Sequence, residues 1–289
     1  MQALFSRGWF LGLLWTAAAF AAPVEHVVIL SLDGGRPDVL LSAETPNLHE
    51  MADRGAWTWW AQTVNPSITL VSHSSMLTGC LPQKHGIHWN KWAPERGYAK
   101  ATTCFEVAKA AGLRTAMVVA KRKFEHLAKP GSVDRFLCVE DEAPVVAEAA
   151  ARVIREDKPH LLFVHFKDGD SVGHAKGWGS REQRQAFEKC DEGVGVLRSA
   201  IRDAGLQSST LFVISADHGG HGKTHGTTDV RDMTIPWIAY APGLVPPHQV
   251  ESSVSTCDTA ATAVAVLGLK PDPSWDGKPV DVLFESPKP

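Results

Sequence analysis

The feature that most constrains the fold is the alternation of short apolar runs with longer amphipathic segments between residues 27 and 267. Apolar runs without interspersed polar residues are typical of strands buried on both faces, and such strands belong to parallel sheets. The predicted strands are Val27–Leu32, Thr115–Ala120, Leu161–Phe166, Leu211–Ser215 and Pro236–Ala241. The predicted helices are Pro46–Arg54, Thr69–Leu77, Cys104–Ala111, Ala143–Arg155, Arg181–Ala204 and Asp258–Leu267. The pattern predicts an α/β fold with a mostly parallel central sheet and helices on both faces.

Composition and charge narrow the class of protein further. The 289 residues are 44% hydrophobic and 21% charged, which is too apolar for a mainly disordered chain. The formal net charge is -3, so the chain has no overall positive charge that would attract a polyanion. We therefore expect no obligate nucleic-acid partner. The five cysteines have no spacing typical of a zinc finger or a CxxC motif. The chain therefore reads as one large globular domain in which the cysteines have no catalytic role.

The N-terminal segment has the features of a secretory signal peptide. Arg7 provides a positive charge, residues 9–22 are mostly apolar, and Ala19-Phe20-Ala21 has the small-x-small pattern of a cleavage site. This apolar run is shorter than the roughly 20 residues that a membrane-spanning helix needs. We therefore expect residues 1–21 to be a signal peptide and residues 22–289 to form a single catalytic domain without a membrane span. The protein is then secreted or periplasmic, and its oligomeric state and disulfide pairing stay open.

Acidic turns follow three of the predicted strands: Asp33-Gly34-Gly35, Asp168-Gly169-Asp170 and Asp217-His218-Gly219-Gly220. In open α/β sheets, ligands bind at the carboxyl ends of the strands, so turns at these ends are expected to meet at one site. A single Asp-Gly pair after a strand is usually only a turn. Together, however, the Asp and His side chains expected on loops after these strands form a mixed donor set that suits Zn²⁺ or a similar divalent ion. The candidates are Asp33, Asp170, His174, Asp217, His218 and His225.

The segment around Thr69 offers a nucleophile. A helix that begins at Thr69 places its hydroxyl at the amino end, where free N–H groups and the helix dipole favour a phosphate. A threonine at the start of a helix is also a common N-cap, so this motif alone leaves both interpretations open.

The motifs occur in a fixed order along nearly the whole chain, from Val27 to Phe284. They are Ser31-Leu32-Asp33-Gly34, Pro66-x-x-Thr69-x-x-x-His73, Thr78-Gly79-x-x-Pro82-x-x-His85-Gly86-Ile87-x-x-Asn90, Asp170-x-x-Gly173-His174, Ser215-x-Asp217-His218-Gly219 and His225-Gly226. This ordered set resembles the alkaline phosphatase superfamily, and within it the type I phosphodiesterase/nucleotide pyrophosphatase branch and its short bacterial members. The resemblance implies an alkaline phosphatase-like fold and hydrolysis of small-molecule phosphate esters or nucleotides.

The resemblance also implies a role for each site residue and two divalent metal ions, for which zinc is expected. One ion would be held by Asp33, Thr69, Asp217 and His218, and the other by Asp170, His174 and His225. Thr69 would be the nucleophile and form a phosphothreonine intermediate. Asn90, with the backbone N–H of Thr69, would bind a non-bridging phosphate oxygen.

Three of these assignments have rivals. His221 rivals His225 as the last ligand, but Gly226 after His225 continues the family pattern. Asp168 rivals Asp170, but only Asp170 has the family spacing to Gly173-His174. Cys80-Leu81-Pro82-Gln83-Lys84 resembles the modified-cysteine motif of sulfatases, although it follows Thr78-Gly79 instead of preceding it. We therefore favour His225, Asp170 and a phosphate substrate.

The preferred type of phosphate ester depends on the surroundings of Asn90. Trp89 and Trp92 flank it and either stack on a base or aryl group or belong to the core or rim. Lys84, Lys91 and Lys167 are cations expected nearby, which argue for a monoester. On balance we expect a diester to be preferred. A phosphomonoesterase on the same site and a catalytically silent metal- or ligand-binding protein are the alternatives.

Overall fold

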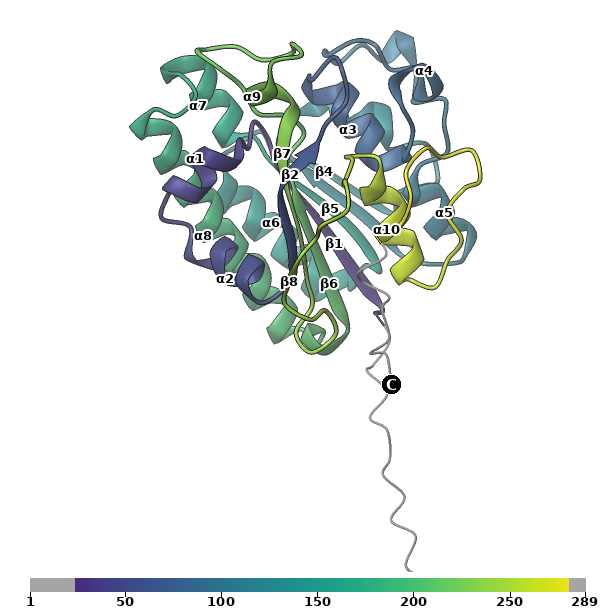
Figure 1. Cartoon of the computed structure of the whole chain (residues 1–289). Helices are drawn as coiled ribbons and strands as arrows, with labels where there is room; N and C mark the ends of the chain where they lie inside the picture. Colours follow the sequence, from purple (N-terminus) through teal and green to yellow (C-terminus); the bar gives the residue numbers. More distant parts are fainter. Residues whose placement is uncertain (1–23, 281–289) are drawn as a thin grey trace, which may run out of the picture.

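The computed structural model describes residues 24–280, so the predicted signal peptide at residues 1–21 lies outside the described residues. Within residues 24–280, an eight-stranded sheet has the order β4-β3-β5-β1-β6-β7-β2-β8 (Figure 1). Its strands are β1 His26–Leu32, β2 Ala56–Gln62, β3 Thr115–Val119, β4 Arg135–Cys138, β5 Leu161–Phe166, β6 Thr210–Ser215, β7 Thr234–Tyr240 and β8 His248–Gln249. Neighbouring strands are parallel, except that β7 is antiparallel to β6 and β2. The predicted class of fold is confirmed.

Helices cover both faces of the sheet, as Figure 1 shows. One face carries α1 Pro37–Ser42, α2 Pro46–Asp53, α6 Ala143–Asp157 and α8 Arg181–Asp203. The other face carries α3 Thr69–Thr78, α5 Cys104–Ala110 and α10 Asp258–Val266. The remaining helices are α4 Pro82–His85, α7 Asp168–Lys176, α9 Val230–Met233 and the 3-10 turns η1 Pro94–Arg96, η2 Arg122–Leu127 and η3 Gln207–Ser209. None of the described helices is long and apolar enough to cross a membrane.

The central strand β1 shows why the buried strands are continuously apolar. Successive side chains of a strand point to opposite faces. Val27 and Ile29 belong to the core on the α3 side, and Val28 and Leu30 belong to the core on the α8 side. Both faces are covered, so all of β1 is buried. Each of these side chains contributes about 1.5–3 kcal/mol by leaving water.

One predicted strand is confirmed with a new detail, and one predicted placement is corrected. The predicted buried strand Pro236–Ala241 is present as β7, which is antiparallel to both of its neighbours within a mostly parallel sheet. A strand buried on both faces has the same apolar composition whether it is parallel or antiparallel to its neighbours, so its sequence does not distinguish the two arrangements. The pattern also placed Asp170 and His174 on a loop. Instead, α7 begins at Asp168, and both residues lie on this helix.

The topology places the carboxyl ends of β5, β1 and β6 next to one another. In register, Ser31 of β1 lies opposite His165 of β5 and Ser215 of β6. The residues that follow these strands therefore meet at one edge of the sheet, and β3, next to β5, ends at the same edge. This is where open α/β sheets bind ligands.

Candidate active site

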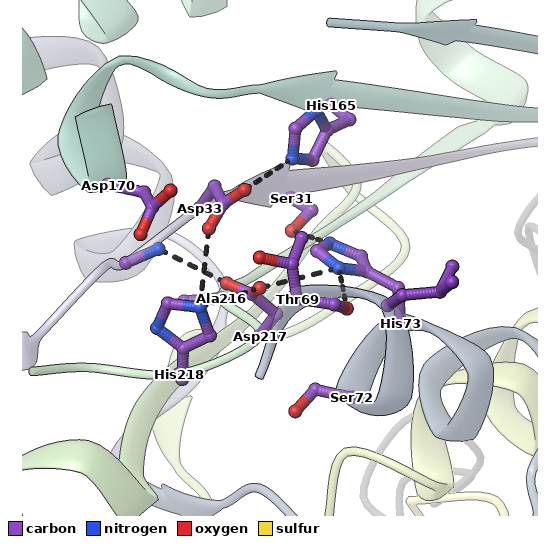
Figure 2. A network of polar contacts seen from close by, with 12 residues as sticks. Ser31, Asp33, Thr69, Ser72, His73, His165, Asp170, Ala216, Asp217 and His218 are labelled. Atoms are coloured by element: carbon purple, nitrogen blue, oxygen red, sulfur yellow. Dashed lines mark hydrogen bonds and ion pairs between the residues drawn. The ribbon is translucent and has the colours of Figure 1, made fainter. Parts of the chain in front are cut away.

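The first group of converging side chains contains Asp33, Asp217 and His218, which follow β1 and β6. His218 Nε2 lies 3.4 Å from Asp33 Oδ1 and 3.1 Å from Asp217 Oδ2 (Figure 2). All three residues are fully buried. None of these three atoms has a hydrogen-bond partner among the described residues. Single ligand atoms of the group lie within 4.8 Å of one another, so the three side chains could hold one cation.

The second group contains Asp170, His174 and His225. Asp170 and His174 are one turn apart on α7, and His174 Nε2 lies 3.3 Å from Asp170 Oδ1. His225 comes from the loop before α9, and its Nε2 lies 3.4 Å from the same Asp170 oxygen and 3.2 Å from His174 Nε2. The His225 ring stacks on the His218 ring with centroids 3.6 Å apart, which joins the two groups.

Unpartnered buried atoms test whether the residues present fit metal ions. Among residues 24–280, eight buried side-chain atoms have no hydrogen-bond partner, one of them Asp168 Oδ2. Four of the eight belong to the two groups: Asp33 Oδ1, Asp170 Oδ1, Asp217 Oδ2 and His218 Nε2. Each unsatisfied buried polar group costs about 1–3 kcal/mol, and more when it is charged. Carboxylate and imidazole are the donors that bind Zn²⁺ and similar divalent ions. The donor set therefore fits two such ions.

The rival ligands have other partners. His221 Nδ1 lies 2.7 Å from Asp232 Oδ1, which ties its ring to the base of the loop instead of to the metal-facing atoms. Asp168 Oδ1 accepts a hydrogen bond of 3.1 Å from the backbone N–H of Ala143 at the start of α6. The fold therefore brings His225 into the second group instead of His221, and Asp170 instead of Asp168.

Thr69 is the first residue of α3, and its side chain lies beside Asp33, Asp217 and His73 (Figure 2). The N-cap position is Ile68, so Thr69 does not have the N-cap role that the sequence left open. No described group accepts a hydrogen bond from the backbone N–H of Thr69. His73 donates from Nδ1 to the Thr69 carbonyl at 2.7 Å and contacts Ser31 Oγ through Nε2 at 2.7 Å. The amino end of α3 thus presents a hydroxyl and a free N–H to the two groups.

Asn90 lies next to this helix end. Its side-chain oxygen accepts a hydrogen bond of 2.9 Å from the backbone N–H of Leu70, the second residue of α3. The same oxygen accepts a second hydrogen bond of 2.9 Å from Lys123 Nζ. With the oxygen occupied, the amide nitrogen is the donor that Asn90 can offer to a ligand.

Three further side chains reach the site although none of them was predicted from the sequence: Lys121, Lys123 and His165. Lys121 Nζ lies 2.5 Å from Asp33 Oδ2 and 2.6 Å from Asp170 Oδ2, so it links one carboxylate of each group. His165 Nε2 lies 2.9 Å from the same Asp33 oxygen. The sequence contained a signal for the two lysines. Lys121 and Lys123 follow the predicted strand Thr115–Ala120, just as the acidic turns follow other predicted strands.

The pKa values of the carboxyls differ because their surroundings differ. Burial raises the pKa of Asp217 well above its ordinary value, and the nearby Asp33 carboxylate adds to this effect. Burial also acts to raise the pKa of Asp33, but Lys121 and His165 outweigh it and lower this pKa well below the ordinary value. The pKa of Asp170 is lowered to about 2, because His174 and Lys121 outweigh burial and the Asp33 charge. Two of the three carboxyls are thus held ionised.

The histidines and lysines respond to the same surroundings. Burial, with a contribution from His225, lowers the pKa of His218 to about 4, so its imidazole is neutral as metal binding requires. Burial acts to lower the pKa of Lys121, but Asp33 and Asp170 raise it above its ordinary value. Burial lowers the pKa of Lys123 to about 8, and the positive charge of Lys121 contributes to this decrease. Both lysines are therefore mainly protonated at pH 7.

The sequence suggested three more side chains for the site: Trp92, Lys84 and Cys80. The structure places each of them in a different environment. Arg122 covers one face of the Trp92 ring at 3.8 Å, so that face is not free for a base. Lys84 pairs with Asp276 at 2.5 Å and donates to the Ser274 carbonyl at 2.8 Å, and within residues 24–280 it forms no hydrogen bond with Asn90. Cys80 is buried just beyond the carboxyl end of α3, whereas Thr69 is at its amino end. The sulfatase-like motif is therefore not at the amino end of α3, where the sequence predicts the nucleophile.

Comparison with known proteins identifies the family. Residues 27–233 match the family of type I phosphodiesterase/nucleotide pyrophosphatase. An uncharacterized pyrophosphatase/phosphodiesterase of Schizosaccharomyces pombe is 26% identical over 218 residues, covering 67% of this chain and 44% of that protein. Human ectonucleotide pyrophosphatase/phosphodiesterase family member 1 is 24% identical over 223 residues, covering 70% of this chain and 24% of that protein. The chain thus spans less than half of the length of these two relatives.

Solved structures share the fold. An inactive variant of murine ectonucleotide pyrophosphatase/phosphodiesterase 5, in complex with AMP, superposes with a TM-score of 0.74 at 14% identity, covering 86% of this chain and 96% of that one. The lipoteichoic acid synthase LtaP from Listeria monocytogenes superposes with a TM-score of 0.73 at 16% identity, covering 91% of this chain and 77% of that one. At these identities the likeness concerns the fold, which is alkaline phosphatase-like. The family match covers most of the chain, so the protein belongs to the type I phosphodiesterase/nucleotide pyrophosphatase family.

Proposed function

We propose that the protein is a metal-dependent hydrolase of phosphate esters, of the phosphodiesterase/nucleotide pyrophosphatase type, with Thr69 as its nucleophile. The observation that carries this proposal is the position of Thr69, at the free amino end of α3 and beside the unpartnered atoms of the first group. The second group is tied to the same helix end, because His225 Nδ1 lies 2.9 Å from the carbonyl oxygen of Ser67. The AMP bound to murine family member 5 supports a nucleotide or a similar small molecule as the substrate.

Two divalent metal ions, for which we infer zinc, would occupy the two groups. Asp33, Asp217 and His218, with the Thr69 oxygen, would hold one, and Asp170, His174 and His225 would hold the other. When bound, such ions neutralise the charge of the phosphoryl group and increase the acidity of a hydroxyl. His165 and Lys121 orient Asp33 from its other oxygen, which leaves Oδ1 directed at the ion.

The side chains of this protein account for the remaining steps. The N–H of Thr69 and the amide nitrogen of Asn90 would donate to the non-bridging oxygens, where negative charge increases. The Thr69 oxygen would form a bond to phosphorus while the bond to the leaving-group oxygen breaks, which gives a phosphothreonine. Water would then attack the phosphorus from the side that the leaving group vacated, which regenerates Thr69 and releases the phosphate product. Two in-line displacements give net retention at phosphorus.

A phosphomonoesterase is the second candidate function, because two lysines lie at the site. Lys121 and Lys123 place positive charge beside Asp33, Asp170 and Asn90, and dedicated monoesterases use such added charge for the dianionic substrate. The nucleophile and the metal-facing residues are the same in both candidates.

Thr69→Ala tests the proposed function. Removing the nucleophile should reduce kcat by several orders of magnitude, while the zinc content measured by elemental analysis stays near that of the wild type. Thr69→Ser should retain part of the rate and allow a phosphoenzyme to be trapped by acid quenching. Ser74→Ala is the matched control, because within residues 24–280 this hydroxyl on the same helix bonds only the Leu70 carbonyl, at 2.6 Å. Near-normal turnover by Thr69→Ala would refute the proposal.

Localisation follows from the predicted signal peptide. We propose that the mature protein is secreted or periplasmic and begins at Ala22. Mass spectrometry of protein recovered from the periplasm or medium measures this directly. A mature chain that still starts at Met1 would contradict it.

A further inference from the structure

Two lysines after β3 reach the site in different ways. Lys121 Nζ contacts Asp33 Oδ2 and Asp170 Oδ2, so its charge is offset by two carboxylates. Lys123 Nζ contacts the neutral oxygen of Asn90 at 2.9 Å, and no carboxylate of residues 24–280 forms an ion pair with it. Asp33, Asp170 and Asp217 act on this charge only from beyond ion-pair distance, so Lys123 is a cation at the site without an ion-pair partner among the described residues.

The fold holds Lys123 firmly in this position. It belongs to η2, where the next residue, Phe124, is fully buried. The Phe124 ring packs against His73 with centroids 4.7 Å apart and against Phe163 at 5.5 Å. Lys123 itself is largely buried, and burial of an ammonium group without a counter-charge is costly. An anion that binds beside it would remove this cost.

The Asn90 oxygen shows where such an anion would lie. It accepts hydrogen bonds of 2.9 Å from both Lys123 Nζ and the N–H of Leu70, so the ammonium group lies beside the amino end of α3. A phosphoryl group attacked by Thr69 occupies this helix end. Its non-bridging oxygens, or a phosphate attached directly to it, therefore come close to the Lys123 charge.

We propose that Lys123 is a specificity-determining residue that makes this site prefer phosphoryl groups with a second negative charge. That charge is either on the attacked group itself, as in a monoester, or on a phosphate attached to it, as in a nucleotide anhydride. This proposal rests on the proposed function. It also revises the diester preference expected from Trp89 and Trp92, because a simple diester has only one negative charge.

The charges of the site favour the same class of substrate. Lys121 offsets one of the three carboxylates of Asp33, Asp170 and Asp217. Two divalent ions would therefore leave the loaded site positive even before Lys123 is counted. A doubly charged substrate neutralises more of this charge than a singly charged one, and hydrogen bonds between ionised groups are about twice as strong as neutral ones.

Substitution of Lys123 tests the proposal on three substrates: bis-p-nitrophenyl phosphate, p-nitrophenyl phosphate and ATP. Lys123→Met should lower kcat/KM for a doubly charged substrate by about tenfold or more relative to the bis-aryl diester, and Lys123→Arg should restore most of the ratio. A selective loss with p-nitrophenyl phosphate identifies the monoester as the source of the second charge, and a selective loss with ATP identifies the anhydride. Arg122→Met is the matched control, because it removes the same charge from the neighbouring exposed residue.

Binding provides a second readout. In zinc-loaded protein, Lys123→Met should weaken inorganic phosphate in isothermal titration calorimetry by about tenfold and leave dimethyl phosphate nearly unchanged. Equal losses for all three substrates and for both ligands would overturn the proposal, while the function proposed for Thr69 would stand. Activity in Thr69→Ala would instead overturn the proposed function on which this proposal rests, and that result is distinguishable from equal losses in Lys123→Met.

Discussion

Replacement of Asp217 by Asn should change stability in opposite directions without and with metal. The Asp217 side chain is fully buried, and its Oδ1 accepts a hydrogen bond of 3.1 Å from the N–H of Gly34. Its Oδ2 has no hydrogen-bond partner and lies 3.1 Å from His218 Nε2. Burial and the Asp33 charge raise the pKa of Asp217 well above its ordinary value. In the metal-free protein, replacing this carboxyl by an uncharged amide should therefore increase the free energy of unfolding.

The sign of the pH dependence follows from the raised pKa. The metal-free folded protein keeps the Asp217 proton at pH values where the unfolded chain has released it, above about pH 3.9. The Asp217 contribution to the free energy of unfolding is therefore complete below that pH and decreases as pH rises through the folded-state pKa. Asn does not titrate, so its advantage grows over the same interval. We expect a gain of about 1–3 kcal/mol, the cost of an unsatisfied buried group.

Bound zinc should reverse this effect, because Asn is a poorer ligand than a carboxylate. An ion present at 100 times its dissociation constant stabilises the folded state by about 2.7 kcal/mol. A variant that binds the ion about 100-fold more weakly loses most of that amount. Asp217→Asn should thus be more stable than the wild type in chelator and less stable in zinc.

Urea denaturation at pH 5 and pH 8, with chelator or zinc, measures both effects. Asp191→Asn is the matched control, because this buried carboxylate accepts hydrogen bonds from the N–H groups of Asn47 at 3.0 Å and Leu48 at 2.8 Å, at the start of α2. It should destabilise the protein equally in both conditions. If Asp217→Asn also destabilises the chelated protein at pH 8, the assignment of Asp217 as a metal-facing residue is wrong.

Three further predictions concern the metal groups and the packing. His225→Ala should lose about one zinc per chain in elemental analysis and most of the activity, whereas His221→Ala should keep its zinc. The reverse pattern would show that His221, and not His225, is the ligand. Chelation should abolish turnover of the wild type, and added zinc should restore it in the same assay. Gly169→Ala should lower the unfolding free energy measured in urea by about 1–3 kcal/mol, because the added Cβ would lie 2.2 Å from the Phe187 ring; an unchanged value would refute this clash.

The sequence by itself determined the buried strands and the residues that follow them. Strands such as Val27–Leu32 are covered on both faces, so their burial produces an unbroken apolar run that is recognisable without a structure. The acidic turns were also recognisable, because turn chemistry depends on adjacent residues. β2 was missed because it has neither an unbroken buried run nor a regular alternation: Thr58 and Trp59 are both buried, Trp60 faces solvent, and the strand lies near the edge of the sheet.

Only the tertiary structure decided which of these residues meet. The choice of His225 over His221 depends on the loop in which Asp232 holds His221. The position of Lys123 depends on η2 packing against α3, which brings its ammonium group to Asn90, 33 residues away in the chain. Local patterns report burial and turns because these depend on near neighbours. The distance between residues far apart is set by strand register and helix packing, which no short stretch of sequence contains.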